Sequence, residues 1–291
     1  MAGSFFFFSA LIIEFINRNY FQFDPLYPNE TKRKHMSNET ILEAVNLTKA
    51  FGGLVAVDDV SIQIKKQTLH AIIGPNGAGK TTLFNVLSGV MPPSAGRVLY
   101  KGEDITHHSP QKRAHLGIGR SYQITNIFQN LTVLENIRLG AQAMGRDNFK
   151  LFQRADHYTS YFKRAEEVIA TVGLSGREMV LARNLPHGEK RKLELGIMLA
   201  CDPELLLFDE PTAGMSSEQV PELIEIINKV VQEKERTAIL VEHRMDMVMS
   251  ISDVITVMNQ GRILAEGSPH EIANNPQVQT AYLGDLYGEL A

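Results

Sequence analysis

Three features are scarce in this chain, and each scarcity excludes a class of protein. Cys201 is the one cysteine among 291 residues, so no internal disulfide can form and a disulfide-stapled scaffold is excluded. Positive charge is not in excess, because the formal net charge is −4, so an overall attraction to nucleic acid is not expected. No apolar run reaches the roughly 18 residues that a membrane-spanning helix needs. These absences favour a reducing compartment, with the cytoplasm as the default, and no nucleic acid as partner.

The composition that is present is typical of a globular protein. Apolar residues make up 44% of the chain and charged residues 21%, which excludes collagen-like and disordered classes. At roughly 100 to 200 residues per domain, the length fits one large domain or two lobes. The chain is therefore long enough to bury a substantial core.

The first 36 residues differ from the rest. Residues 5–16 are nearly all apolar, but such a helix would extend roughly 18 Å, short of a hydrocarbon core of about 30 Å, and Glu14 interrupts it. The basic residues 32–34 follow this stretch, whereas a secretory signal carries its positive charges ahead of it. We expect residues 1–36 to be disordered or to precede the true translation start at Met36, with an amphipathic anchor as the alternative. Residues 37–291 then form the domain.

The apolar pattern predicts an α/β fold. Residues 41–45 and 60–64 alternate as half-buried strands do, and residues 131–199 have helical periodicity. Short buried strands are predicted at residues 70–73, 205–208, 238–241 and 254–257, with a helix over 220–234. This spacing is typical of βαβ units in a parallel sheet, and we expect strands from both sides of a helical subdomain at about 126–203 to share one sheet. Asn259, Gln260 and Gly261 predict a hairpin.

A phosphate-binding loop follows the strand at residues 70–73. The residues that match the P-loop pattern and lead into a helix are Gly74, Pro75, Asn76, Gly77, Ala78, Gly79, Lys80 and Thr81, with Thr82 next. The glycines let successive N–H groups and the helix N-terminus face a phosphate chain. Lys80 adds positive charge and Thr81 a hydroxyl for Mg²⁺, so the loop predicts binding of a nucleoside triphosphate.

Two carboxylates end the buried strand at residues 205–208. Asp209 and Glu210 stand where ligands bind in open α/β sheets, at the carboxyl end of a strand. Asp209 is placed to face Mg²⁺ through water or through Thr81, and Glu210 to deprotonate a water that attacks the γ-phosphate. An acidic pair at this position is otherwise most often a helix cap, but the P-loop in the same chain favours the catalytic interpretation.

In order and spacing, these motifs resemble those of the ATP-binding subunits of ABC transporters, over essentially all of residues 41–291. The resemblance implies a P-loop NTPase (RecA-like) core with a helical subdomain and an antiparallel β subdomain. It assigns Gln123, in a loop after Arg120, to Mg²⁺ and the attacking water. His243 resembles the switch histidine that bonds to the γ-phosphate, and Phe51 resembles the aromatic residue that stacks on adenine.

The signature motif of that family has a counterpart that departs from the usual sequence. Gly188 lies at the start of a predicted helix, and by resemblance its N–H groups face the γ-phosphate held by a second subunit. Pro186 stands where a serine is usual, so one phosphate-binding hydroxyl is missing, and Ser216 stands where an aspartate is common in the loop after the acidic strand. Pro186 also suits an ordinary helix start.

The resemblance is narrower still for the ATPases of branched-chain amino acid importers. It rests on Phe51, Gly52 and Gly53, on the altered signature, and on residues 213–215, 281–284 and about 144–164. It implies an ATP- and Mg²⁺-dependent ATPase, peripheral on the cytoplasmic face of the inner membrane. The implied partners are a second ATP-binding subunit, transmembrane permease subunits and, indirectly, a substrate-binding protein. By the same resemblance, the surface near residues 124–136 receives a short helix of the permease and transmits ATP-driven closure to it.

Three other functions remain open from the sequence. The ATPase could serve a urea importer or a lipopolysaccharide extractor, because the cargo contacts other chains. A soluble regulatory ABC ATPase is a different class, but such proteins commonly carry two ATPase cores or long coiled-coil inserts. A P-loop GTPase would require an Asn-Lys-x-Asp guanine-binding motif, which this chain does not contain.

Overall fold

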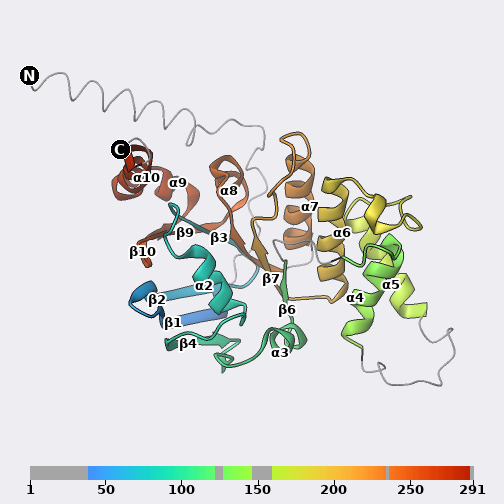
Figure 1. Cartoon of the computed structure of the whole chain (residues 1–291), viewed down its shortest axis with the longest axis horizontal. Helices are drawn as coiled ribbons and strands as arrows, with labels where there is room; N and C mark the ends of the chain where they lie inside the picture. Colours follow the sequence, from blue (N-terminus) through green and yellow to red (C-terminus); the bar gives the residue numbers. More distant parts are fainter. Residues whose placement is uncertain (1–38, 122–126, 146–158, 234–235, 289–291) are drawn as a thin grey trace, which may run out of the picture.

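The computed structural model describes residues 39–121, 127–145, 159–233 and 236–288, and they form two sheets with helices packed around them (Figure 1). The larger sheet has the strand order β10-β9-β3-β8-β7-β6. Its members are β3 (Leu69–Ile73), β6 (Ile118–Arg120), β7 (Leu205–Asp209), β8 (Thr237–Val241), β9 (Val254–Asn259) and β10 (Arg262–Gly267).

The larger sheet is parallel except for its edge strand β10, which pairs antiparallel with β9. Every residue of β3, β7 and β8 is buried, as is typical of a parallel sheet covered on both faces. The turn between β9 and β10 holds Gln260 and Gly261 at φ 49° and 79°. Positive φ at both turn residues suits a type I′ hairpin, so the predicted hairpin is confirmed.

The smaller sheet is antiparallel, in the order β2-β1-β4-β5. Its strands are β1 (Thr40–Phe51), β2 (Leu54–Lys65), β4 (Ala95–Tyr100) and β5 (Glu103–Asp104). The expectation of one sheet shared by strands before and after the helical region is right for β3 and β6 but wrong for these four. In β1 and β2, buried residues are interspersed with more exposed ones, which leaves one face for the core and one for solvent, as suits an antiparallel sheet.

Helices cover the larger sheet and extend to one side of it. The helix α2 (Lys80–Leu87) follows β3, and α3 (Pro110–His115) precedes β6. The helices α4 (Val133–Ala143), α5 (Thr159–Thr171) and α6 (His187–Ala200) form a group beside the sheet, with a short 3₁₀ turn η2 (Ala182–Asn184). The remaining helices are α7 (Val220–Glu233), α8 (Met245–Ile251), α9 (Pro269–Ala273) and α10 (Pro276–Gly288).

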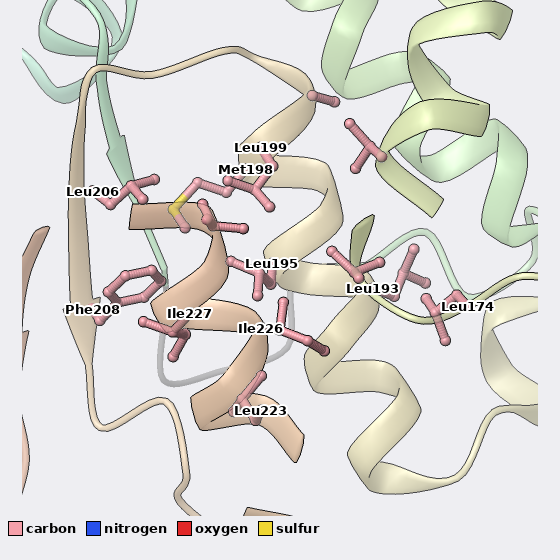
Figure 2. Close-up of a cluster of buried hydrophobic side chains, with 14 of the residues drawn as sticks. Leu174, Leu193, Leu195, Met198, Leu199, Leu206, Phe208, Leu223, Ile226 and Ile227 are labelled. Carbon is pink, nitrogen blue, oxygen red and sulfur yellow. The ribbon is translucent and has the colours of Figure 1, made fainter. Parts of the chain in front are cut away.

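A buried apolar cluster joins the helical group to the acidic strand. Figure 2 shows side chains of α6, α7 and β7 meeting in it: Leu193, Leu195, Met198, Leu199, Leu206, Phe208, Leu223, Ile226 and Ile227. A close-packed contact of this kind fixes α6 against β7, because shifting either element would open a cavity. Within the described part of the chain, no helix is both long and apolar enough to cross a membrane.

Candidate functional site

Three polar segments meet at the carboxyl edge of the larger sheet. Strand register aligns Ile72 of β3 with Val241 of β8, and Val241 with Asp209 of β7. Neighbouring strands lie about 4.8 Å apart, so β3 and β7 are separated by about 10 Å. The P-loop leaves β3, Glu210 follows β7 directly, and His243 follows β8 by two residues. The fold therefore gathers these segments around one space.

Close backbone approach explains the glycines at the two ends of the P-loop. A Cβ added to Gly74, at φ 151°, would lie 2.2 Å from the carbonyl oxygen of Met258. A Cβ on Gly79, at φ 96°, would lie 2.2 Å from that of Ala56. Any larger side chain would force the loop off β2 and β9, so the loop conformation depends on glycine at these positions.

The rest of the P-loop places its polar groups at the start of α2. The ammonium of Lys80 is buried and donates to the carbonyl oxygens of Gly74 at 2.5 Å and Pro75 at 2.8 Å. These bonds fold the lysine back over its own loop and so hold its charge at the P-loop. Thr81 is exposed in the first turn of the helix, and Thr82 is partly exposed. At the tip, Asn76 and Gly77 are exposed, while Ala78 is buried.

Asp209 is a buried carboxylate with one oxygen available. Its Oδ2 lies 3.5 Å from the guanidinium of Arg120, and its backbone N–H donates to the hydroxyl of Ser121. Burial raises the pKa of Asp209, while the guanidinium of Arg120 opposes that rise. Its Oδ1 is buried and has no hydrogen-bond partner among the described residues. A buried oxygen of this kind fits a hard cation such as Mg²⁺, with the Thr81 hydroxyl as a second donor.

Glu210 and His243 form a pair. The Nε2 of His243 lies 2.7 Å from Oε1 of Glu210, and the two side chains are 47% and 23% exposed. The backbone of Glu210 is left-handed, at φ 48°, and its N–H donates to the carbonyl of Val241 at 2.9 Å. A non-glycine residue held in this region stores local strain, and such residues cluster at functional sites. The chain thus turns sharply at the end of β7, and the carboxylate of Glu210 faces the loop after β8.

Of two other predicted site residues, the structure describes Phe51 but not Gln123. Phe51 is 49% exposed at the end of β1, with the ammonium of Lys49 5.2 Å from the centre of its ring, so it is not part of the core. Gln123 lies outside the described residues, as do residues 1–36. The segments at residues 124–136 and 144–164 are described only in part.

The altered signature motif forms the N-terminus of α6. Pro186 is the N-cap residue, and no side chain caps this helix end. Gly188 is buried against the side chain of Gln219, where an added Cβ would lie 2.9 Å from Cδ. His187 is exposed and lies against Gly214 of the loop after β7. The fold therefore brings the signature helix and that loop into contact within one chain.

The sequence interpretation gave no role to Glu242, Thr212 or Arg120. Glu242 is buried and accepts hydrogen bonds from Thr212 and from the backbone of His243. Arg120 stacks on Phe84 of α2 and lies beside Asp209. A signal for Glu242 was present, because it directly follows the buried parallel strand β8, as Glu210 directly follows β7.

Comparison with known proteins gives two family matches. A model described as ABC transporter matches residues 57–213. A second, described as branched-chain amino acid ATP-binding cassette transporter, matches residues 262–286.

Individual relatives match along most of the chain. The high-affinity branched-chain amino acid transport ATP-binding protein LivG of Escherichia coli is 36% identical over 255 residues, covering 85% of this chain and 99% of LivG. BraF of Pseudomonas aeruginosa is 37% identical, covering 84% and 98%. A solved nucleotide-free ATP-binding cassette of an ABC transporter is 30% identical with a TM-score of 0.71, covering 84% and 99%. A cassette in its ADP conformation is 29% identical with a TM-score of 0.72, covering 84% and 99%.

Proposed function

The chain belongs to the ABC transporter family of ATP-binding proteins, of the branched-chain amino acid type, and from this premise we propose that it powers import of branched-chain amino acids. It is an ABC ATPase. The observation that carries the proposal is the meeting of the P-loop, Asp209, and the Glu210–His243 pair at one sheet edge. A site of this composition binds a triphosphate and places a base beside it.

The cargo is supported by the relatives rather than by the site. LivG and BraF are both named for branched-chain amino acid transport, and each is matched along nearly its whole length. The nucleoside import ATP-binding protein NupA of Lactococcus lactis is also 36% identical, but this chain covers 43% of it. The match of residues 262–286 to the branched-chain amino acid model favours the first cargo.

Nucleotide binding falls to the P-loop and its neighbours. Backbone N–H groups of residues 76–82 and the N-terminus of α2 cradle the phosphates, and Lys80 neutralises their charge. Thr81 and the free oxygen of Asp209 hold Mg²⁺, with Gln123 as a further ligand. The exposed ring of Phe51 stacks on adenine. The metal supplies charge neutralisation on the phosphates when it is bound.

Hydrolysis falls to the pair at the end of β7 and β8. Glu210 accepts a proton from the attacking water, because its carboxylate is partly buried and beside the phosphate space. His243 bonds to Glu210 in this structure. When nucleotide binds, His243 turns its imidazole N–H toward the γ-phosphate. Lys80 and His243 then stabilise the charge that develops on the transferred group.

Two further sets of partners complete the proposal. A second ATP-binding subunit faces this one head to tail, so that the N-terminus of α6 at Gly188 meets the nucleotide of the partner. Because Pro186 offers no hydroxyl there, the backbone N–H groups carry that contact. Transmembrane permease subunits provide the path and hold the ATPase at the cytoplasmic face of the membrane, where a substrate-binding protein acts indirectly.

Replacing Glu210 with Gln tests the catalytic part. Glu210→Gln should lower the turnover number about 100-fold or more, since loss of a general base costs about 10²- to 10⁴-fold. The Kd for ATP should stay within about threefold, because the P-loop is unchanged, and nucleotide-bound dimers should accumulate. Glu204→Gln, at the opposite end of β7 and paired with Lys101, is the matched control. Undiminished turnover in Glu210→Gln would remove this residue from its role.

Uptake measurements test the cargo. Deleting the gene in its host should abolish high-affinity uptake of labelled leucine, isoleucine and valine, and Glu210→Gln should fail to restore it. Loss of urea uptake with normal leucine uptake would instead assign a urea importer.

A further inference from the structure

We propose that Glu242 is a positioning residue: its buried carboxylate ties the loop after β7 to His243 and so holds His243 against Glu210. This inference rests on the proposed function, because it takes Glu210 and His243 as the hydrolytic pair. It adds a buried residue that sets the geometry of that pair.

Both oxygens of Glu242 are used, and they are used on different segments. Oε1 accepts from the Thr212 hydroxyl at 2.6 Å and from the Thr212 backbone N–H at 3.2 Å. Oε2 accepts from the backbone N–H of His243 at 3.1 Å. One carboxylate therefore bridges a loop that follows β7 and a loop that follows β8.

Because Glu242 is buried, breaking this bridge is energetically costly. Glu242 is 3% exposed, and a carboxylate that leaves water at that depth requires donors in its place. The described contacts provide three donors and no cation, so displacing either loop would leave a buried carboxylate oxygen unsatisfied. The bridge thus resists separate movement of the two loops.

The Thr212 loop is itself anchored on its other side. Arg191 of α6 donates to the carbonyl of Ala213 at 3.3 Å, and His187 lies against Gly214. Helix α6 is in turn fixed to β7 by the apolar cluster of Figure 2. Glu242 therefore ties His243 to a loop that is itself held in place by helix α6.

The contacts close into a ring that contains the hydrolytic pair. The N–H of Ala213 donates to the carbonyl of Glu210 at 3.0 Å, which makes the turn that carries Thr212. Thr212 leads to Glu242, Glu242 to the backbone of His243, and the imidazole of His243 returns to Glu210. Breaking the ring at Glu242 leaves His243 with more freedom, although every group that reacts is still present.

Two variants of the purified full chain break the ring from either side. Glu242→Gln places an amide NH₂ against a donor on one of the two loops, whichever way it is turned. Thr212→Val removes the hydroxyl at constant shape. Each should lower the turnover number about tenfold, because small misplacements of reacting groups are costly, while the KM for ATP stays within about twofold. The double variant should be no slower than the slower single variant, because both cut one link.

Conservative and remote variants separate positioning from packing. Thr212→Ser keeps the hydroxyl and should restore turnover to within about twofold of wild type. Thr237→Val is the matched control, because Thr237 is a buried threonine at the opposite end of β8 whose hydroxyl accepts from Gln67. It should lower the melting temperature without changing turnover. Wild-type turnover in both Glu242→Gln and Thr212→Val would overturn the proposal, as would additive losses in the double variant.

Parallel measurements keep this test separate from that of the proposed function. If Glu210→Gln abolishes turnover while Thr212→Val and Glu242→Gln leave it unchanged, the positioning role alone fails. If Glu210→Gln is as active as wild type, the hydrolytic pair itself is wrongly assigned, and the positioning role fails with it.

Discussion

The two edges of the larger sheet carry similar charged residues and use them in opposite ways. At the amino edge, Asp202 bonds to Arg164 at 2.9 Å and to Arg236 at 2.5 Å, and Glu204 to Lys101 at 2.5 Å. At the carboxyl edge, Asp209 keeps a buried oxygen without a partner among the described residues. We call the amino edge closed, because ion pairs satisfy these charges, and the carboxyl edge open, because Oδ1 of Asp209 has no partner among the described residues.

The difference shows what marks a functional edge in this fold. Charged residues are present at both edges, so charge by itself does not locate the site. What distinguishes the carboxyl edge is the Oδ1 of Asp209, a buried carboxylate oxygen that has no hydrogen-bond partner among the described residues, which costs stability in the free protein. Such groups are stabilised when a ligand arrives, and substitutions at the two edges should therefore separate function from stability.

The largest effect is expected at Lys80, on the open edge. Lys80→Met should weaken ATP binding about 100-fold, because a charge-assisted bond to a phosphate contributes about 3 kcal/mol. The unfolding free energy without nucleotide should change little, since Lys80 bonds to carbonyls of its own loop. Isothermal titration with ATP and denaturant unfolding measure the two quantities. Unchanged affinity would show that the open edge does not bind the triphosphate.

The next largest effect is expected from replacing His70, within β3. This substitution should change the pH dependence of stability and leave ATP turnover unchanged. Burial lowers its pKa from 6.5 to about 4, and its Nε2 bonds to the Thr256 hydroxyl. Between these values the unfolded chain takes up a proton that the folded chain does not, so stability present above pH 6.5 is lost as the pH falls toward 4. The loss is about 3 kcal/mol.

Denaturant titrations at pH 7 and pH 4 check this prediction. His70→Gln should show a decrease between the two pH values smaller by about 3 kcal/mol than wild type, because glutamine does not titrate. ATP turnover at pH 7 should stay within about twofold once both proteins are folded. An equal decrease in both proteins would show that His70 takes up its proton in the folded state.

The smallest effect is expected at the closed edge. Asp202→Asn leaves the buried guanidinium of Arg236 with a weaker acceptor and should lower the unfolding free energy by about 1 kcal/mol. The carboxylate of Asp202 is mostly exposed, which limits the loss. ATP affinity and turnover should be unchanged. A drop in turnover larger than the drop in folded fraction would mean that this edge also acts on the site.

Much of the site was predictable because its residues are adjacent in sequence. The P-loop is one continuous segment, and Gly74 and Gly79 mark it because no other residue fits those backbone positions. Asp209 and Glu210 were predicted from a buried strand that ends in acids. The role of Glu242 was not, because its partner Thr212 is 30 positions away and only the parallel register of β7 and β8 brings them together.

The sequence by itself determined which chemistry the chain carries: a glycine loop, a lysine and hydroxyl at a helix start, and two acids after an apolar strand. These motifs can be predicted from the sequence because they depend on local backbone geometry and on the burial of single strands. The tertiary structure decided which charged groups are satisfied by ion pairs and which remain able to bind a ligand. It did so through strand order, because β8 lies between β3 and β7 and sets His243 beside Glu210. Contacts between residues far apart in the chain depend on packing, and no local pattern encodes them.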